Sequence, residues 1–224
     1  MNTSAIIVAA GRSQRMGFDK LAAPLAGVPV LRRTLDAFLA SECIAAIIVV
    51  CSAERWESLE NADTRSFTKP LTRVDGGATR QDSVANGLAA LAVGTQWVAV
   101  HDGARPLISP EDITRCVAAA GEFGAASLAR RVTETLKRAD AGDFCAEAVA
   151  REQLWFMETP QVFELGLLRE AYAAVRARQL EVTDEVSAAQ AIGKRVKFIE
   201  ATHPNLKITR PADLALASAI LAIQ

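Results

Sequence analysis

A short basic segment near the N-terminus contains the first residues that could do chemistry. Residues 4–10 are small or apolar, and Gly11 follows them. Three cations come next, at Arg12, Arg15 and Lys20. Small residues and a glycine let backbone N–H groups approach an anion closely, and the cations add positive charge around it. The segment predicts a loop that binds phosphate groups, with a solvated loop charge as the alternative for each cation, most of all for Arg12.

A second glycine turn, Gly76-Gly77, lies further along the chain. The helical segment after it begins near Arg80 and Ser83. Such a turn beside the first loop could form part of the same binding site, because a glycine turn lets the backbone approach a ligand. A helix-capping or surface hydroxyl is the alternative for Ser83.

Asp102 lies near the end of an apolar run that starts at Trp97. Open α/β sheets bind their ligands at the carboxyl ends of strands, and a carboxylate in a phosphate site commonly holds a metal ion or a hydroxyl group. The only histidines are His101 and His203, and neither has further ligands at the spacing of a zinc site or a catalytic triad. We therefore expect Asp102 to face the ligand and both histidines to be structural.

Apolar runs and helical segments alternate along the chain, which is typical of a mostly parallel sheet covered on both faces. Strands are expected at Ala5–Ala9, Ala46–Cys51, Trp97–Val100 and Val196–Ile199. Helices are expected at Val30–Ala40, Glu54–Asn61, Gln81–Ala92, Pro110–Phe123, Glu164–Arg178, Asp184–Ala191 and Pro211–Ile223. The predicted fold class is α/β, with a doubly wound sheet of the Rossmann-like kind.

The segment 130–150 departs from this alternation. Residues Val132–Ala139 and Phe144–Val149 alternate in polarity around the turn-like segment Asp140-Ala141-Gly142-Asp143, which predicts a β-hairpin. A hairpin that cannot bury both faces needs a partner, so we expect an arm that pairs with a second subunit. A hairpin folded back on its own domain is the alternative.

Composition limits the class of protein. The 224 residues are 50% hydrophobic with a formal net charge of −1, which fits one globular domain over 1–224 with an arm at about 131–150 and argues against a nucleic-acid binder. No membrane-spanning stretch or signal-peptide pattern is found. Four scattered cysteines are expected to be unpaired, which favours the cytoplasm. They are Cys43, Cys51, Cys116 and Cys145.

An ordered set of motifs spans nearly the whole chain. The motifs are Ala9-Ala10-Gly11, Arg15-Met16, Lys20, Gly76-Gly77, Arg80-Gln81-Asp82-Ser83-Val84, His101-Asp102-Gly103-Ala104-Arg105-Pro106, Thr135-Leu136-Lys137-Arg138, Arg151, Leu154-Trp155, Thr159-Pro160-Gln161, Thr183-Asp184-Glu185 and Lys207-Ile208-Thr209-Arg210-Pro211. Each alone is a weak signal, but together they resemble the 2-C-methyl-D-erythritol 4-phosphate cytidylyltransferases.

The resemblance implies a nucleotidyltransferase fold, a homodimer joined by arm hairpins, and a divalent metal, usually magnesium, on the triphosphate. It implies that CTP reacts with methylerythritol phosphate to give the CDP-alcohol and pyrophosphate, a step in making isoprenoid precursors without mevalonate. In this reaction an ionised phosphate attacks the α-phosphorus, so no side chain has to remove a proton. Catalysis then depends on positioning and on fixed cations that neutralise the transition state.

The same resemblance implies a role for individual residues. The catalytic cations would be Arg15, Lys20 and Lys207. The nucleotide would be bound by Ala9, Ala10, Gly11, Gly77, Arg80, Ser83 and Asp102, with cytosine near Gly77 and Ser83. The second substrate would be bound by Arg105, Thr135, Arg151, Thr159 and Thr183, with Thr135 given across the dimer if the arm is exchanged. The metal would be held by Asp102, directly or through water.

Two of these assignments have simpler alternatives, and the motif around the lysine departs from the family. Thr135 could reflect ordinary strand propensity, and Thr159-Pro160-Gln161 could be a plain turn. The family's usual Pro-Lys-Gln is Asp19-Lys20-Leu21 here, and a common glycine of the first motif is Ser13.

Two other functions stay open. One is cytidylyl transfer to another polyol phosphate such as ribitol 5-phosphate. The other is a non-catalytic domain that binds a nucleotide or dinucleotide. Against the latter, the first loop lacks Gly-x-Gly-x-x-Gly, and cations are distributed as far along the chain as Lys207.

Overall fold

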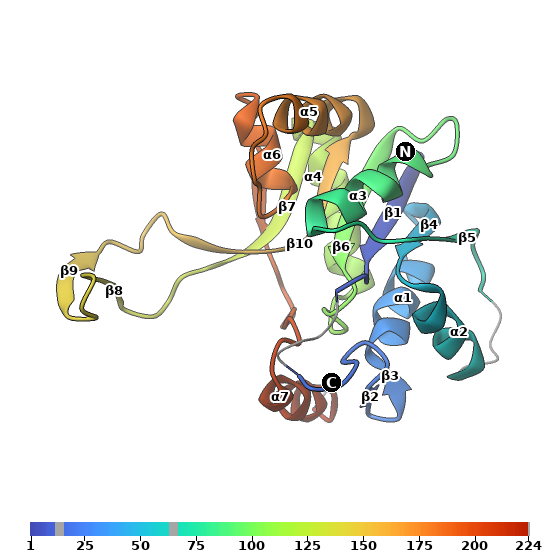
Figure 1. Cartoon of the computed structure of the whole chain (residues 1–224), viewed down its shortest axis with the longest axis horizontal. Coiled ribbons are helices and arrows are strands. Elements are labelled where there is room, and N and C mark those ends of the chain that lie inside the picture. The colour runs from blue at the N-terminus through green and yellow to red at the C-terminus, as the bar shows by residue number, and fades with distance from the viewer. Residues whose placement is uncertain (12–15, 63–66, 224) are drawn as a thin grey trace.

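A seven-stranded sheet forms the centre of the protein, in the order β11-β7-β10-β6-β1-β4-β5 (Figure 1). The computed structural model describes residues 1–11, 16–62 and 67–223. β1 pairs in parallel with β4 and β6, and β10 is antiparallel to both β6 and β7. The strands are β1 Thr3–Val8, β4 Ile44–Val50, β5 Leu71–Val74, β6 Trp97–Asp102, β7 Ala125–Arg131, β10 Trp155–Glu164 and β11 Lys197–Glu200. The predicted mostly parallel α/β sheet is confirmed.

Helices cover both faces of the sheet, because both faces of its central strands are apolar. On β1, Ile7 packs in a core with Leu35 of α1 and Ile113 of α4, whereas its neighbour Ile6 packs in a second core with Leu168 of α5. Successive strand residues point to opposite faces, so an uninterrupted apolar run serves two cores. The helices are α1 Val30–Ala40, α2 Ala53–Ala62, α3 Arg80–Ala89, α4 Pro110–Phe123, α5 Leu165–Ala177, α6 Glu185–Ala191 and α7 Pro211–Leu221.

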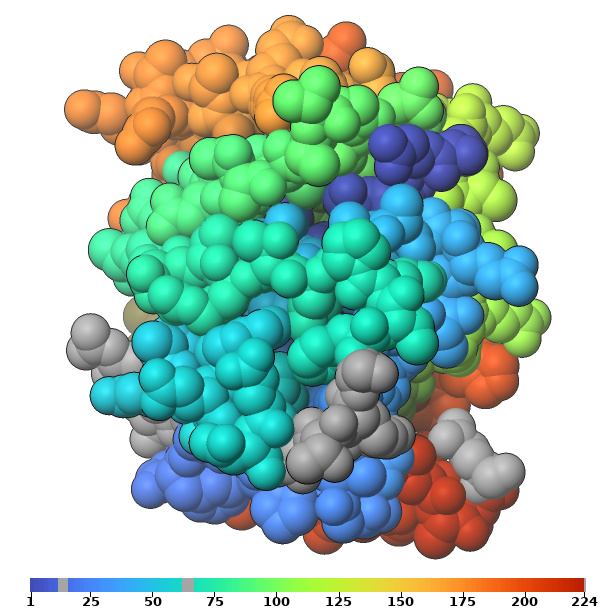
Figure 2. Space-filling view, turned by 90° about the vertical axis from the view of Figure 1, so that its right-hand side faces the viewer, coloured from blue at the N-terminus to red at the C-terminus, as the bar shows by residue number. Residues whose placement is uncertain are grey.

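The expected helices are all present, and α1 and α4 have the predicted bounds. α4 begins as its sequence indicates: the hydroxyl of Ser109 accepts a hydrogen bond from the N–H of Asp112 at 3.1 Å, and Pro110 occupies the first turn. No helix within the described ranges is long and apolar enough to span a membrane. Figure 2 shows the face on which α2, β5 and α3 lie, in cyan to green.

Three strands of the central sheet, β5, β7 and β10, were not expected. β10 contains Thr159-Pro160-Gln161, so the interpretation of that motif as a plain turn is wrong. The Thr159–Pro160 peptide bond is cis, and the register with β7 shifts between Met157 and Gln161. Buried polar residues in this strand break the apolar pattern by which strands are recognised in a sequence.

The predicted hairpin is present and forms an arm. β8 Leu136–Ala139 and β9 Cys145–Val149 pair antiparallel in a sheet of their own, which projects to the left of the body in Figure 1. The carboxylate of Asp140 closes the turn by accepting the N–H groups of Gly142 and Phe144 at 2.8 and 3.0 Å. β8 begins only at Leu136, so the expectation that Thr135 lies on a strand is wrong. A small second hairpin pairs β2 Pro24–Leu25 with β3 Val28–Pro29.

Candidate functional site

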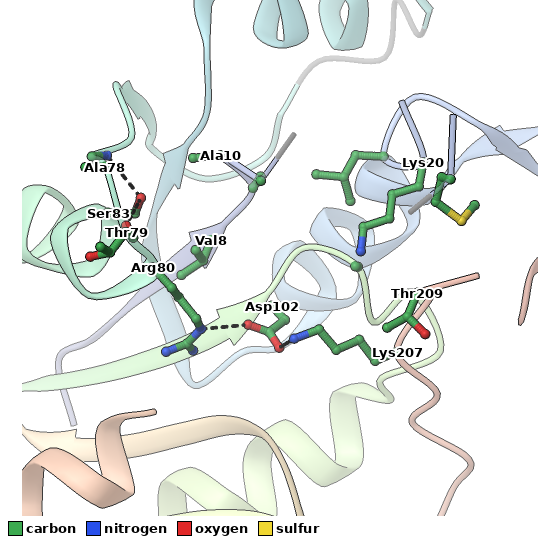
Figure 3. Close-up of a pocket in the computed structure, with 16 residues that line it drawn as sticks. Val8, Ala10, Lys20, Ala78, Thr79, Arg80, Ser83, Asp102, Lys207 and Thr209 are labelled. Atoms are coloured by element: carbon green, nitrogen blue, oxygen red, sulfur yellow. Dashed lines mark hydrogen bonds and ion pairs between the residues drawn. The ribbon is translucent and has the colours of Figure 1, made fainter. Parts of the chain in front are cut away.

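A cavity of about 810 Å³ opens at the carboxyl ends of β1 and β6 (Figure 3). These strands lie side by side in parallel register, with Val8 opposite Asp102, so the segments that follow them meet at one edge of the sheet. The cavity is lined by Val8, Ala9, Ala10, Gly11, Met16, Lys20, Leu21, Gly77, Ala78, Thr79, Arg80, Ser83, Asp102, Ala104, Lys207 and Thr209. Every residue assigned to the nucleotide on the basis of the sequence is among them.

The two glycine segments touch each other at Gly76, which has no side chain to keep them apart. A Cβ on Gly76 would lie 2.3 Å from the Cβ of Ala10, and one on Gly77 would lie 2.2 Å from the Cβ of Asp82. A Cβ on Gly11 would meet only open space, which leaves room for a ligand against the backbone. The glycines therefore define the shape of the cavity wall.

The hydroxyl of Ser83 holds the second glycine turn in place. It donates to the carbonyl of Thr79 at 2.9 Å and accepts the N–H of Gly77 at 3.0 Å. The N–H of Ala9 is also engaged, on the carbonyl of Val50 at 2.8 Å. α3 begins with a capping box between Thr79 and Asp82. A ligand in the cavity would therefore meet a preformed turn.

Asp102 is the centre of charge in the site. Its carboxylate lies 2.7 Å from the Nζ of Lys207, 3.2 Å from the Nε of Arg80 and 3.8 Å from the Nε of Arg105. Burial would raise the pKa of Asp102, but the charges of Arg80 and Lys207 outweigh it and hold the pKa well below its usual range. The ionised carboxylate thus collects cations from three separate segments, two of which reach it in Figure 3.

Lys20 and Lys207 line the same cavity although they are far apart in sequence. The Nζ of Lys20 donates to the carbonyl of Ile208 at 2.7 Å, directly after Lys207, and both lysines line the cavity. The N–H of Ile208 in turn binds the carbonyl of Ala104 at 2.8 Å. The structure therefore brings together two of the three predicted catalytic cations. The third, Arg15, lies outside the described residues, as does Arg12.

The residues predicted for the second substrate are not in the cavity wall. Arg105 and Thr159 are buried behind it, whereas Thr135, Arg151 and Thr183 are not buried. Arg151 donates to the carbonyl of Thr133 at the base of the arm. Within one chain, these residues do not form a single pocket with the nucleotide residues.

Thr159 and His101 form a buried pair behind Asp102. The hydroxyl of Thr159 accepts the N–H of Asp102 at 3.1 Å and lies 2.9 Å from the Nδ1 of His101. The Nε2 of His101 lies 3.3 Å from the carbonyl of Arg105. Burial lowers the pKa of His101 to about 3, so the ring is neutral. Both groups therefore hold the backbone around Asp102, which agrees with the structural role predicted for His101.

Three functional contacts were missed by the sequence analysis. Glu185, which is fully buried, accepts two hydrogen bonds from the guanidinium of Arg80 at 2.8 and 3.0 Å and one from the hydroxyl of Tyr172 at 2.9 Å. Arg55 on α2 reaches the first loop. Glu185 lies in a family motif and could have been found there, but nothing in the local sequence distinguishes Tyr172 or Arg55.

Among the described residues, the cavity offers a metal ion only one carboxylate, so a metal bound there would take most of its ligands from the substrate phosphates. No cluster of three histidine, cysteine or acidic side chains suited to a metal occurs in ranges 1–11, 16–62 and 67–223. Asp102 is the one carboxylate lining the described cavity, and magnesium is commonly held by one or two carboxylates together with substrate phosphates.

A family model for 2-C-methyl-D-erythritol 4-phosphate cytidylyltransferase matches residues 3–223. The chain belongs to this family. A cytidylyltransferase of that name from Geobacillus kaustophilus is 42% identical over 225 residues, which cover 99% of this chain and 98% of that protein. One from Pelotomaculum thermopropionicum is 39% identical, covering 97% and 93%.

Solved structures agree with the assignment to the cytidylyltransferase family. The enzyme of this name from Thermus thermophilus has a TM-score of 0.81 at 34% identity and covers 99% of this chain and 100% of that chain. The 4-diphosphocytidyl-2C-methyl-D-erythritol synthase from Anaerococcus prevotii has a TM-score of 0.87 at 28% identity, covering 99% and 98%. This chain is therefore a nucleotidyltransferase, and its fold is that of cytidylyltransferases.

Proposed function

We propose that this enzyme transfers CMP from CTP to 2-C-methyl-D-erythritol 4-phosphate and releases pyrophosphate. The product is 4-diphosphocytidyl-2-C-methyl-D-erythritol, an intermediate in the formation of isoprenoid precursors without mevalonate. The observation that carries the proposal is the family match over residues 3–223, and a cavity lined by Lys20, Arg80 and Lys207 supports it. We also propose that the protein is located in the cytoplasm, because its four free cysteines fit reducing conditions.

The chemistry needs charge neutralisation rather than proton removal. A phosphate oxygen of the second substrate forms a bond to the α-phosphorus of CTP, and the bond from that phosphorus to the bridging oxygen of pyrophosphate breaks. Negative charge then accumulates on the equatorial and leaving oxygens. Lys20 and Lys207 line the cavity as fixed cations, with Arg15 as the third member proposed from the sequence. Fixed cations stabilise such charge without reorganising during the reaction.

Asp102 orients the cations in this mechanism. Its contacts with Lys207 and Arg80 hold both side chains at the cavity wall before substrate arrives. The carboxylate could also contact the ribose or a magnesium ion, directly or through water. When bound, magnesium supplies further positive charge on the triphosphate. The turn at Gly77 and Ser83, together with the backbone of Ala10, is the proposed position of cytosine.

A homodimer completes the second-substrate site in this proposal. Thr135 and Arg151 belong to the arm region and do not line the cavity of their own chain. On the arm, Phe144 is 74% exposed, a large apolar surface for an isolated hairpin. We infer that the arm of one subunit brings Thr135 and Arg151 to the cavity of the other. The proposal keeps Thr183 in that site, with Arg105 and Thr159 supporting it from behind the cavity wall.

The reaction is tested by incubating the protein with CTP, magnesium and one alcohol phosphate, and measuring pyrophosphate release. We expect turnover with 2-C-methyl-D-erythritol 4-phosphate. A strong preference for ribitol 5-phosphate would contradict the proposed substrate. Binding of NADH without turnover of CTP would contradict the proposed reaction.

The shared site is tested by mixing two variants that are each inactive, Lys20→Ala and Arg151→Ala. After subunit exchange, each mixed dimer has one site with both changes and one site with neither. About a quarter of wild-type activity should return if equal amounts exchange freely. No recovery from a mixture shown to contain mixed dimers would contradict the shared site.

A further inference from the structure

Arg55 on α2 lies outside the cavity, but its guanidinium binds residues on both sides of the first glycine loop. Its Nε lies 2.9 Å from the carboxylate of Asp19, its Nη2 donates to the carbonyl of Gly11 at 3.2 Å, and its Nη1 donates to the carbonyl of Ala9. One guanidinium thus bridges the backbone that enters the loop and the residue directly before Lys20.

Asp19 passes this contact on to the backbone around Lys20. While one carboxylate oxygen faces Arg55, the other accepts the N–H of Leu21 at 3.0 Å. The carbonyl of Asp19 also accepts the N–H of Ala23 at 3.1 Å. Asp19 therefore links Arg55 to the backbone directly after Lys20, and this contact restrains the point from which the Lys20 side chain extends.

Because Arg55 is nearly buried, its contacts favour one position of the residues that it binds. The side chain of Arg55 is only 11% exposed, and a cation so far removed from water needs acceptors nearby. Its hydrogen-bond acceptors in the described structure are Ala9, Gly11 and Asp19. Moving these three residues away from Arg55 would leave a nearly buried charge without its partners, which is strongly unfavourable.

We propose that Arg55 is a positioning residue for catalysis, acting through Asp19 on Lys20 and directly on the loop backbone. The proposal rests on the proposed function, because it assigns Lys20 to the reacting phosphates. It also explains the departure at position 19: where the family's usual residue is proline, this chain has a carboxylate that binds the arginine of α2. Arg55 itself does not line the main cavity.

The kinetic test is Arg55→Gln, with Arg33→Gln as the matched control. Arg33 also donates to two backbone carbonyls, of Leu25 at 2.6 Å and Ala26 at 3.1 Å, but in the β2–β3 turn. We expect Arg55→Gln to lower kcat by about 10- to 100-fold, since a small misplacement of a catalytic group is enough for such a loss. The KM for the alcohol phosphate should change less than about twofold, because within the described part of the chain the contacts of Arg55 and Asp19 involve none of the residues proposed to bind it. Wild-type kcat in Arg55→Gln, or an equal loss in Arg33→Gln, would overturn the proposal.

Coupling between the two residues is measured with Asp19→Asn, alone and combined with Arg55→Gln. If they act as one unit, the double variant should be about as impaired as Arg55→Gln alone. Losses that multiply would show that Arg55 does not act through Asp19 and would overturn that route.

A readout without substrate separates this proposal from the proposed function. Trypsin cleavage after Lys20 requires the segment to leave its place on Arg55. We expect cleavage at that bond, followed by mass spectrometry, to be at least about threefold faster in Arg55→Gln than in wild type or Arg33→Gln, since it reports local opening. Equal cleavage rates would refute the proposal that Arg55 holds this segment in place. A wild-type protein that lacks turnover but shows this difference would refute only the proposed function.

Discussion

Replacing Glu185 by glutamine tests whether the buried ion pair with Arg80 is a structural support of the site. The amide puts an NH2 donor where Glu185 now accepts from Arg80 and from the hydroxyl of Tyr172. Removing one partner of a buried pair costs about 3–5 kcal/mol. Arg80 keeps Asp102 at 3.2 Å and is 26% exposed, which favours the lower end, about 3 kcal/mol.

Thermal unfolding followed by circular dichroism measures this cost. For a chain of this length each kcal/mol lowers Tm by about 2–4 °C, so Glu185→Gln should lower Tm by about 6–12 °C. Glu200→Gln is the matched control, because Glu200 pairs with Arg131 at 3.4 Å where both side chains are more than half exposed. Such exposed pairs contribute about 0–1 kcal/mol. Equal shifts in the two variants would refute the argument that burial gives the Glu185 pair its strength.

Three further outcomes are expected. Lys20→Ala and Lys207→Ala should each lower turnover by about a hundredfold or more, with an unchanged far-ultraviolet circular dichroism spectrum, because each removes a fixed cation from the transition state; retained turnover would assign that lysine to solvent. Gly76→Ala should raise the KM for CTP by about tenfold or more, since its Cβ would lie 2.3 Å from that of Ala10 and force the loops apart; an unchanged KM would contradict this. Because burial lowers the pKa of His101 to about 3, the unfolded chain alone takes up that proton, and stability should fall by about 2 kcal/mol from pH 7 to pH 5 in urea unfolding; His101→Gln should lose this slope.

Local signals in the sequence were sufficient for most helices and for the first loop. The serine cap and proline at the start of α4 indicated its first residue, because capping needs only neighbours within one turn. The apolar run that ends before Gly11 likewise predicted a strand that leads to a ligand loop, because both signals lie within a few neighbouring residues. Family motifs then predicted that Lys20 and Lys207 meet, and the structure places both in one cavity.

Strand β10 could not be predicted in this way. Its buried residues Glu158, Thr159 and Gln161 are polar, and their partners come from other parts of the chain. Asn205 binds the carboxylate of Glu158 at 3.1 Å, and Gln161 accepts the N–H groups of Glu185 and Val186 at 3.0 Å. A polar residue can be buried when a distant partner satisfies it, and a local pattern carries no trace of that partner.

The sequence by itself determined the order of elements, the sheet class, the glycine turns and the cations that a phosphate ligand needs. Only the tertiary structure decided that Arg55 holds the loop before Lys20 and that Glu185 holds Arg80 against Asp102. Helix periods and caps are set by interactions between near neighbours, so they can be found in a short window of sequence. Contacts such as that of Arg80 with Glu185 depend on which segments the folded sheet brings together, and that choice is made by the packing of the whole chain.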